Sequence, residues 1–190
     1  MANAIEIEAK ALVSQADYKK LAKKFSAYPR YTQTNYYIDS ESRILVKDDI
    51  ALRIRQKGER YELTLKTPLS EGRLEKNTVI SEADFVAYRD HGTFPKGDIS
   101  RFLTMLGFNI SELRILTSLT TDRIDVEYKG GLLSIDRNTY SGETDYEVEL
   151  EYNNMDGAKA ILGKLFEEMD IHAPFTDVTK VHRAMAAIGK

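Results

Sequence analysis

Two stretches of the sequence place charged side chains at every second position. Residues 5–11 read IEIEAKA, so Glu6, Glu8 and Lys10 alternate with apolar residues. Residues 143–152 read ETDYEVELEY, in which the alternating acids are Glu143, Asp145, Glu147, Glu149 and Glu151. Because successive side chains of a strand point to opposite faces, each stretch gathers its charges on one face. Carboxylate oxygens are the ligands that Mg²⁺ and Mn²⁺ prefer, so these acids could hold a divalent cation.

Basic residues follow the same alternation on the segments between these two stretches. The candidates are Arg53 and Arg55 in LRIR, Lys66 in YELTLK and Arg123 in TDRIDVEY. In LSID, Asp136 shares a face with Ser134. Guanidinium and ammonium groups bind phosphate oxygens. Acids and bases that surround one cavity would therefore suit a polyanion that carries a divalent metal.

The alternative is an ordinary sheet whose apolar face packs on helices and whose charged face lies in water. Successive acids on one face of a strand are ~7 Å apart, and in water each pair repels by only ~0.6 kcal/mol. At an effective dielectric constant near 20, the repulsion rises to about 2.4 kcal/mol per pair. An enclosed acidic face would therefore need cations or raised pKa values.

The local pattern predicts about eight strands, with helices between and after them. Strands are expected at 5–11, 30–39, 51–57, 61–67, 73–80, 112–128, 132–140 and 143–152, and most neighbours in sequence form antiparallel hairpins. Helices are expected at 15–25, after an N-cap at Ser14, from Ser81 to Asp90, and at 99–106, 156–169 and 177–188. Residues 43–47 are left unassigned.

This order of elements indicates an α+β fold in which a large antiparallel sheet closes on itself. Helices must cover the apolar faces of the strands, so the charged faces of all the strands should look the same way. If the sheet closes, they share one interior, and a barrel of about eight strands has room for side chains or one small ligand.

The composition limits the remaining possibilities. The chain has 190 residues, which predicts one domain over 1–190, and its 42% of hydrophobic residues can fill a core. A net charge of −3 argues against coating nucleic acid or an anionic membrane. The absence of cysteine, of a signal peptide and of any long apolar run predicts a cytoplasmic protein. The oligomeric state is left open.

The ordered set of motifs resembles a known family. EIEAK fits the ExExK motif of the CYTH domain, also called the triphosphate tunnel metalloenzymes, and it lies on the first strand. TNYYID, LRIR, LTLK, TDR, SIDRN, EVELE and a late TKVHR follow in the family's order, over nearly the whole chain. Within the family, the chain resembles the small, stand-alone bacterial branch.

The resemblance implies an eight-stranded antiparallel β-barrel that forms a tunnel, with helices packed outside, and it implies roles for individual residues. Glu6, Glu8 and Lys10 would be catalytic. Metal, expected as two Mg²⁺ or Mn²⁺ ions that bridge phosphate oxygens and activate water, would be bound by Glu6, Glu8, Asp136, Glu147, Glu149 and, as a weaker candidate, Glu151. Phosphates would be bound by Lys10, Arg53, Arg55, Lys66, Arg123, Lys180 and Arg183. The inward face of the strand that carries Glu75 and Lys76 is not determined by the pattern, so neither residue is assigned.

The leading hypothesis is a metal-dependent triphosphatase that acts on a small-molecule triphosphate, with inorganic triphosphate as the first choice because no tryptophan is present to stack a base. Adenylate cyclase, which converts ATP to cyclic AMP, and thiamine triphosphatase are the alternatives. A non-catalytic module that binds polyphosphate or a nucleotide is a further alternative, disfavoured by the retained acids. His91, His172 and His182 are predicted to lie on the surface or to serve packing. Neither a membrane nor a nucleic acid is an expected partner.

Overall fold

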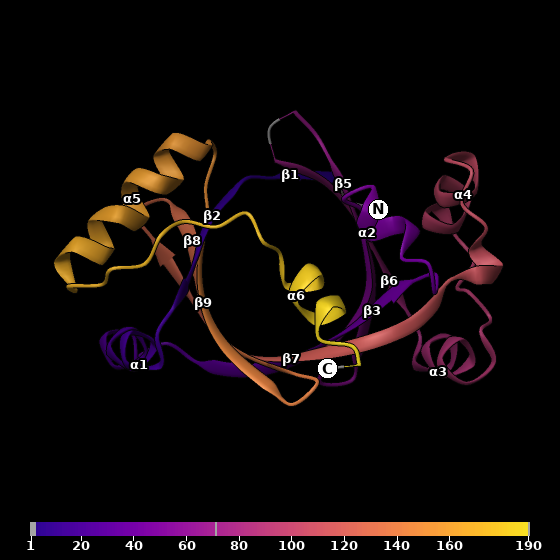
Figure 1. The fold of residues 1–190 in the computed structure, drawn as a ribbon, viewed down its shortest axis with the longest axis horizontal. Coiled ribbons are helices and arrows are strands. Elements are labelled where there is room, and N and C mark those ends of the chain that lie inside the picture. The colour runs from indigo at the N-terminus through magenta and orange to yellow at the C-terminus, as the bar shows by residue number, and fades with distance from the viewer. Residues whose placement is uncertain (1–2, 71, 190) are drawn as a thin grey trace.

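A single antiparallel sheet rolls into a ring in the computed structural model, which describes residues 3–70 and 72–189 (Figure 1). Its strands are β1 (Asn3–Glu6), β2 (Glu8–Val13), β3 (Arg30–Asp39), β4 (Ala51–Lys57), β5 (Arg60–Pro68), β6 (Arg73–Ile80), β7 (Arg114–Tyr128), β8 (Gly131–Tyr140) and β9 (Glu143–Glu151). They lie in the order β1-β6-β5-β4-β3-β7-β8-β9-β2. The predicted α+β barrel is confirmed.

The expected N-terminal strand is divided in two, and this division closes the ring. β1 pairs with β6, where Glu6 lies opposite Arg73, whereas β2 pairs with β9, where Glu8 lies opposite Glu151. The chain therefore passes from one edge of the sheet to the other at Ile7. The part of the chain that the structure describes thus shows nine strands where eight were expected.

A close backbone approach accompanies the bend at Ile7. Gly72, immediately before β6, has a φ of +74°, and a Cβ atom at this position would lie 2.4 Å from the carbonyl oxygen of Glu6. The Tyr152 amide donates to the carbonyl oxygen of Ile7 at 2.9 Å. Only glycine combines this left-handed conformation with so close an approach. Gly72 therefore leaves room for the junction between β1 and β2.

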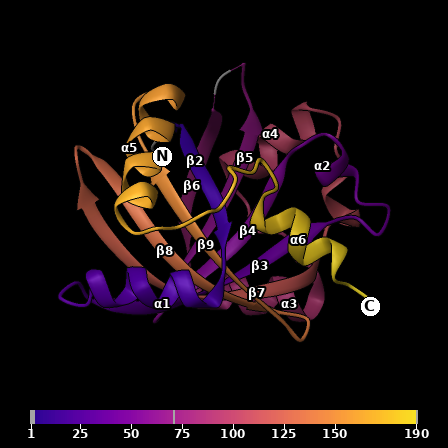
Figure 2. The same ribbon diagram turned by 60° about the vertical axis from the view of Figure 1, so that its left-hand side comes forward.

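Helices cover the outside of the ring in two groups (Figures 1 and 2). The helices are α1 (Gln15–Lys24), α2 (Ile44–Lys47), α3 (Glu82–His91), α4 (Asp98–Met105), α5 (Met155–Glu168) and α6 (Lys180–Ala186), with a 3-10 turn at Ile110–Glu112. α1 and α5 pack on the apolar outer faces of β2, β8 and β9, while α3 and α4 pack on those of β4 and β5. Ser14 and Ser81 cap α1 and α3 as predicted.

The C-terminal helix α6 lies within the ring and not on its outside (Figure 1). Its apolar residues Val181, Ala184 and Met185 are buried against Tyr37 of β3 and Leu119 of β7. Both strand residues belong to the inward faces of their strands. α6 therefore brings a second apolar surface, and its own charged residues, into the interior of the barrel. Among the residues that the structure describes, no helix is long and apolar enough to cross a membrane.

Candidate active site

The charged faces of the strands converge on one cavity inside the barrel, as the sequence predicted. The cavity holds about 840 Å³ of space free of protein atoms, counting its open mouth. Its lining includes these predicted site residues: Glu6, Glu8, Lys10, Arg53, Arg55, Lys66, Arg123, Glu149, Glu151 and Lys180. The alternative of a charged face spread into open water is therefore wrong for this set of residues.

The residues of the opening motif reach the cavity from both sides of the bend at Ile7. The Lys10 ammonium contacts the Glu8 carboxylate and lies 3.9 Å from Oε1 of Glu149, and Lys10 is only 9% exposed. Burial alone would lower the pKa of Lys10, but the neighbouring carboxylates outweigh it and raise the pKa. Lys10 therefore remains an ammonium group between two acids that come from β2 and β9.

Glu75 belongs to the interior, although the sequence pattern left it unassigned. Its Oε2 atom lies 2.9 Å from the Lys66 ammonium, which also contacts Glu6. The Asn77 amide donates to Oε1 of Glu75 at 2.6 Å. Burial acts to raise the pKa of Glu75, but Lys66, Arg53 and this hydrogen bond lower it to about 2. Lys76 points to the outside, where its ammonium lies 5.1 Å from the centre of the Phe102 ring.

Two arginines of β4, Arg53 and Arg55, are here called the open cations. Among the residues that the structure describes, neither has a carboxylate oxygen within 4 Å, and Nε of Arg53 is buried without a hydrogen-bond partner. Nε of Arg55 donates to the Asn35 amide oxygen at 3.2 Å. Burial, together with the charges of Arg53 and Arg123, lowers the pKa of Arg55 to about 10. Both guanidinium groups therefore lack a matching anion among the described residues.

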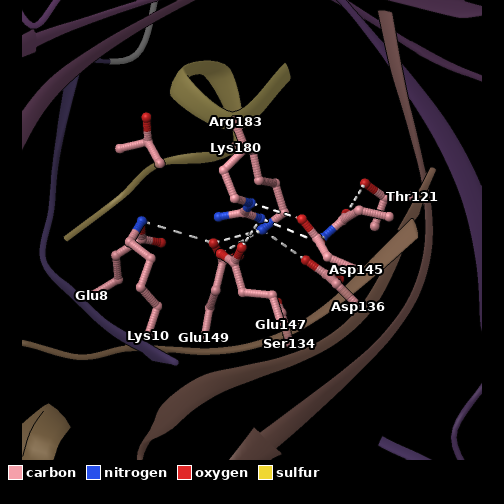
Figure 3. Close-up of polar contacts among 12 residues, drawn as sticks. Glu8, Lys10, Thr121, Ser134, Asp136, Asp145, Glu147, Glu149, Lys180 and Arg183 are labelled. Atoms are coloured by element: carbon pink, nitrogen blue, oxygen red, sulfur yellow. Dashed lines mark hydrogen bonds and ion pairs between the residues drawn. The ribbon is translucent and has the colours of Figure 1, made fainter. Parts of the chain in front are cut away.

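A second group of charges, the paired cluster, lies beneath α6 (Figure 3). It consists of Asp136, Asp145, Glu147, Glu149, Arg123, Lys180 and Arg183. The Lys180 ammonium lies 2.9 Å from Asp136, 2.9 Å from Glu147 and 2.7 Å from Glu149. Arg123 makes a two-pronged contact with Asp136 at 2.7 and 2.6 Å. Every cation of this cluster thus has at least one carboxylate partner.

Arg183 anchors α6 within the paired cluster. Its Nε atom donates to Asp145 at 2.8 Å, and its Nη2 atom contacts Glu147, which is fully buried. Asp145 in turn accepts hydrogen bonds from Asn138 at 2.9 Å and from the Tyr140 hydroxyl at 2.7 Å. Asp136, Glu147 and Arg183 are not part of the cavity lining, whereas Lys180 lines the cavity and contacts both buried acids.

Glu147 and Glu149 titrate as a pair. Burial and the neighbouring Glu149 raise the pKa of Glu147, although Lys180 and Arg183 oppose this shift. Burial would also raise the pKa of Glu149, but Lys180, a hydrogen bond from Glu147 and Arg123 lower it well below its ordinary value. The two carboxyl groups therefore take up protons as a coupled pair, and the pKa of Glu147 lies above that of Glu149.

The carboxylates at the cavity suit a divalent cation for two reasons: their oxygens are ligands that such ions prefer, and a bound cation would reduce the repulsion among them. Burial and the nearby charges of Glu6 and Glu8 raise the pKa of Glu151, so an added cation would relieve this repulsion. Among the described residues, no three acidic or histidine side chains already stand at metal-binding distances. Lys66 and Lys10 instead contact Glu6 and Glu8. Metal binding would therefore require these lysines to exchange partners.

The remaining polar residues behave mainly as structural groups. Thr34 points outward and shares a hydrogen bond with Thr120 at 3.0 Å, whereas Tyr37 lines the cavity. His182 contacts the Thr179 hydroxyl that caps α6, at 2.7 Å. His91 and His172 are exposed. Sequence reasoning missed Gln33 and Asn35, two neutral side chains of β3 that also line the cavity. Their alternation with Tyr31 and Tyr37 was the available signal.

The family model of the CYTH domain matches residues 4–184. A match over so much of the chain establishes the class, and the protein belongs to the CYTH domain family. It is 31% identical over 174 residues to YjbK of Bacillus subtilis, a protein to which triphosphatase activity is ascribed, and the match covers 90% of each chain.

Solved structures agree with this assignment. A candidate adenylate cyclase of Bacillus halodurans, bh2851, is 31% identical and superposes with a TM-score of 0.89, covering 96% of this chain and 98% of the other. A candidate adenylyl cyclase of Hippeastrum, HpAC1, is described as having a dominant triphosphatase activity. It is 24% identical with a TM-score of 0.73, over 95% of this chain and 96% of that one, and this likeness concerns the fold.

Proposed function

We propose that the protein is a metal-dependent hydrolase of inorganic triphosphate and that one domain, residues 1–190, carries the activity. The observation that carries this proposal is the charge imbalance of the cavity, where the open cations Arg53 and Arg55 face carboxylates without pairing with them. A half-buried cation without an anion is less stable than the same cation in water, so it destabilises the folded protein. Retaining two of them in a cavity is accounted for by a polyanionic ligand.

The basic side chains would bind and orient the phosphate chain. Arg53 and Arg55 offer guanidinium donors to non-bridging phosphate oxygens, and Arg123 and Lys10 lie on neighbouring walls of the same cavity. These groups neutralise the charge that accumulates on the transferred phosphoryl group and on the leaving group. Lys66 and Lys10 would also stabilise the ligand-free state, because they neutralise Glu6 and Glu8 in the absence of metal.

Glu6, Glu8, Glu149 and Glu151 are the acids at the cavity, and they would hold Mg²⁺ or Mn²⁺. When bound, such an ion polarises phosphate oxygens and lowers the pKa of water. Asp136 and Glu147, which the resemblance also assigns to metal, are enclosed by Arg123, Lys180 and Arg183. In the absence of metal, Asp136 and Glu147 would instead hold Lys180 at the cavity wall, so that its ammonium group lies beside Glu149.

Inorganic triphosphate is the preferred substrate because the cavity wall is mainly charged. The apolar side chains that reach the cavity, Tyr37, Ala51, Leu132 and Val181, come from four different elements. Among the described residues, the lining shows no aromatic pair placed to enclose a purine or a thiazole ring. A substrate that consists of phosphate alone uses every cation and needs no such pair.

The proposal is tested by changing one carboxylate at the cavity. Glu8→Gln keeps the size of the side chain but removes the charge, so release of phosphate from inorganic triphosphate with Mg²⁺ should fall below detection while the far-ultraviolet circular dichroism remains unchanged. Glu41→Gln, which changes an exposed acid outside the cavity, is the matched control and should retain full turnover. Unchanged turnover by Glu8→Gln would refute the role of this carboxylate.

A product analysis separates the alternatives. The protein is incubated in parallel with inorganic triphosphate, ATP and thiamine triphosphate in Mg²⁺ or Mn²⁺. Orthophosphate released fastest from inorganic triphosphate supports the proposal, whereas cyclic AMP from ATP would establish an adenylate cyclase. Faster release from thiamine triphosphate would move the substrate to that compound. Tight binding of all three without turnover would make the protein a binding module.

A further inference from the structure

The inward face of β3 carries a row of neutral side chains, and one of them lacks a partner. In this row, the Tyr31 hydroxyl donates to Asp125 and the Asn35 amide oxygen accepts from Arg55. The Tyr37 ring packs against α6. Gln33 is only 4% exposed and lines the cavity, yet among the residues that the structure describes no hydrogen bond to its side-chain amide is found.

The Gln33 amide lies where a ligand can reach it. Gln33 is nearly enclosed, but its amide is not sealed from the cavity, so water there can hydrate it. A bound molecule that enters the cavity can replace this water. An amide that is held at the wall without a hydrogen bond inside the protein is therefore available to a polar ligand at this point.

The charged side chains on the two strands beside Gln33 indicate the chemical class of that ligand. In the sheet, Asn35 lies opposite Arg55 of β4, and Tyr31 lies opposite Arg123 of β7. Gln33, halfway between Tyr31 and Asn35, is thus the diagonal neighbour of both guanidinium groups, at the ~7–8 Å that long side chains span. A third cation here would repel the other two, and a carboxylate would neutralise them. A neutral donor does neither.

We infer that Gln33 is a substrate-contacting residue, whose amide donates a hydrogen bond to an oxygen of the phosphate group held between Arg55 and Arg123. This inference rests on the proposed function, since it takes the ligand of the cavity to be a phosphate chain. β3 is the fifth of the nine strands in sheet order, and β1 and β2 are the first and the ninth. Gln33 therefore contacts the substrate from across the ring, opposite the wall that carries Glu6 and Glu8.

The experiment compares three variants. Gln33→Leu removes the donor at similar size, and Gln33→Glu replaces it with an anion of the same shape. Gln56→Leu is the matched control, because Gln56 is on β4, points to the outside of the barrel and accepts a hydrogen bond from Tyr36. Binding of inorganic triphosphate is measured by calorimetry in the presence of a chelator, and KM and kcat are measured with Mg²⁺.

We expect Gln33→Leu to raise both the Kd and the KM about tenfold, as for a lost hydrogen bond to a charged group, with kcat within about twofold. Gln33→Glu should raise both about a hundredfold because it repels the phosphate. Gln56→Leu should match the wild type in Kd and KM. The melting temperature of ligand-free Gln33→Leu should stay close to that of the wild type, because the Gln33 amide makes no hydrogen bond within the described residues. If the leucine variant does not fold, Gln33→Ser, which shortens the side chain, takes its place.

Two failures are distinguishable. If the wild type binds and hydrolyses inorganic triphosphate and Gln33→Leu does so with the same Kd and KM, the contact is refuted and the proposed function stands. If the wild type neither binds nor hydrolyses inorganic triphosphate, the proposed function fails, and the role of Gln33 fails with it.

Discussion

The interior of the barrel contains two groups of arginine and lysine residues that differ in whether their charges are matched. In the paired cluster, Arg183, Lys180 and Arg123 each contact carboxylates at hydrogen-bond distance. The open cations, Arg53 and Arg55, lie across the cavity on β4 and have no such partner among the described residues. Arg123 of the paired cluster and both open cations come from strands with the same alternating pattern, so the pattern does not determine which role a charge takes.

The pKa values record this difference. Burial acts to lower the pKa of Arg183, but the neighbouring Glu147 and Asp145 outweigh it and raise the pKa. For Arg55, burial and the cations Arg53 and Arg123 act together and lower the pKa to about 10. A raised pKa means that the surrounding protein stabilises the charged form, and a lowered one means the opposite. The paired cluster therefore stabilises the fold, in particular the position of α6. Arg55 is therefore retained at the expense of stability, as charged groups of binding sites are.

Breaking the paired cluster should have the largest effect on stability. Arg183→Met leaves Asp145 and the fully buried Glu147 without their guanidinium partner, and such a loss costs about 3–5 kcal/mol of the free energy of unfolding. Urea denaturation at pH 7 measures this change. The control Arg137→Met, on the outer surface 3.9 Å from Asp122, should change stability by less than about 0.5 kcal/mol.

The same variant also tests the role that the resemblance gives to Arg183. If Arg183 serves mainly to dock α6, inorganic triphosphate should still bind to the folded variant within about fivefold of the wild-type affinity, a change of only ~1 kcal/mol. A hundredfold loss of affinity with unchanged stability would place Arg183 among the phosphate-binding residues and would break the comparison.

The ion pair Lys66–Glu75 belongs neither to the paired cluster nor to the open cations. Its contribution to stability should depend on pH. The pKa of Glu75 is lowered to about 2 in the folded protein. A carboxyl group whose pKa is lower in the folded state than in the unfolded state stabilises the fold at any pH above the unfolded-state pKa. This contribution is lost as the pH falls through the folded-state pKa. Glu75→Gln should therefore be less stable than the wild type by about 3 kcal/mol at pH 7.

The difference between Glu75→Gln and the wild type should shrink as the pH falls from about 4.5 towards 2. Urea denaturation of both proteins between pH 7 and pH 3 measures it. Glu82→Gln, which changes an exposed acid in the first turn of α3, is the control. A difference that is independent of pH would show that Glu75 acts through packing and not through its charge.

The sequence predicted that charges gather inside the barrel, because strict alternation of charged and apolar residues is visible in β2, β4, β7 and β9. It could not assign Glu75, because β6 reads RLEKNTVI and carries charges on both faces. Only pairing with β5, where Lys66 lies opposite Glu75, determines the inward side. Lys76 then belongs to the outer surface near Phe102, which is distant in sequence.

Two features of the fold depend on contacts that no local pattern reveals. The alternation of IEIEAK continues across Ile7, although the chain leaves one edge of the sheet there and joins the other, next to Gly72. α6 shows the same mixture of apolar and basic residues as a surface helix. It lies inside because Lys180 and Arg183 find buried carboxylates from β8 and β9. In the same way, the missing partners of Arg53 and Arg55 become visible only when all their neighbours are placed.

Removing Arg183 should reduce stability more than affinity for inorganic triphosphate, whereas removing an open cation should reduce affinity and leave stability unchanged or higher. Arg55→Met deletes a half-buried charge whose pKa is lowered, so the free energy of unfolding should stay the same or increase. The affinity for inorganic triphosphate should fall about a hundredfold, equivalent to ~2.7 kcal/mol. Calorimetry and urea denaturation on one preparation measure both quantities. Arg60→Met, in the exposed β4–β5 hairpin, is the control, and a loss of stability in Arg55→Met would contradict the classification of Arg55.

The smallest predicted effect comes from converting an open cation into a paired one. Asn35, which is 1% exposed, accepts a hydrogen bond from Nε of Arg55 at 3.2 Å. Asn35→Asp would place a carboxylate at this point, so that Arg55 acquires the kind of partner that Arg183 already has. The paired guanidinium should bind phosphate less well, and the Kd for inorganic triphosphate should rise about tenfold, or ~1.4 kcal/mol.

Asn35→Ala separates pairing from the loss of an anchor. It leaves Arg55 without its hydrogen bond but adds no charge. The guanidinium keeps its full charge for phosphate and loses only one positioning contact, so the Kd should rise only about threefold, or ~0.7 kcal/mol. The aspartate variant should therefore bind more weakly than the alanine variant, in spite of its closer resemblance in shape to asparagine. If Asn35→Asp binds inorganic triphosphate as tightly as the wild type, a matching carboxylate does not suppress phosphate binding. The contrast between the open cations and the paired cluster would then lie in position alone, with β4 facing the open cavity and Arg183 enclosed beneath α6.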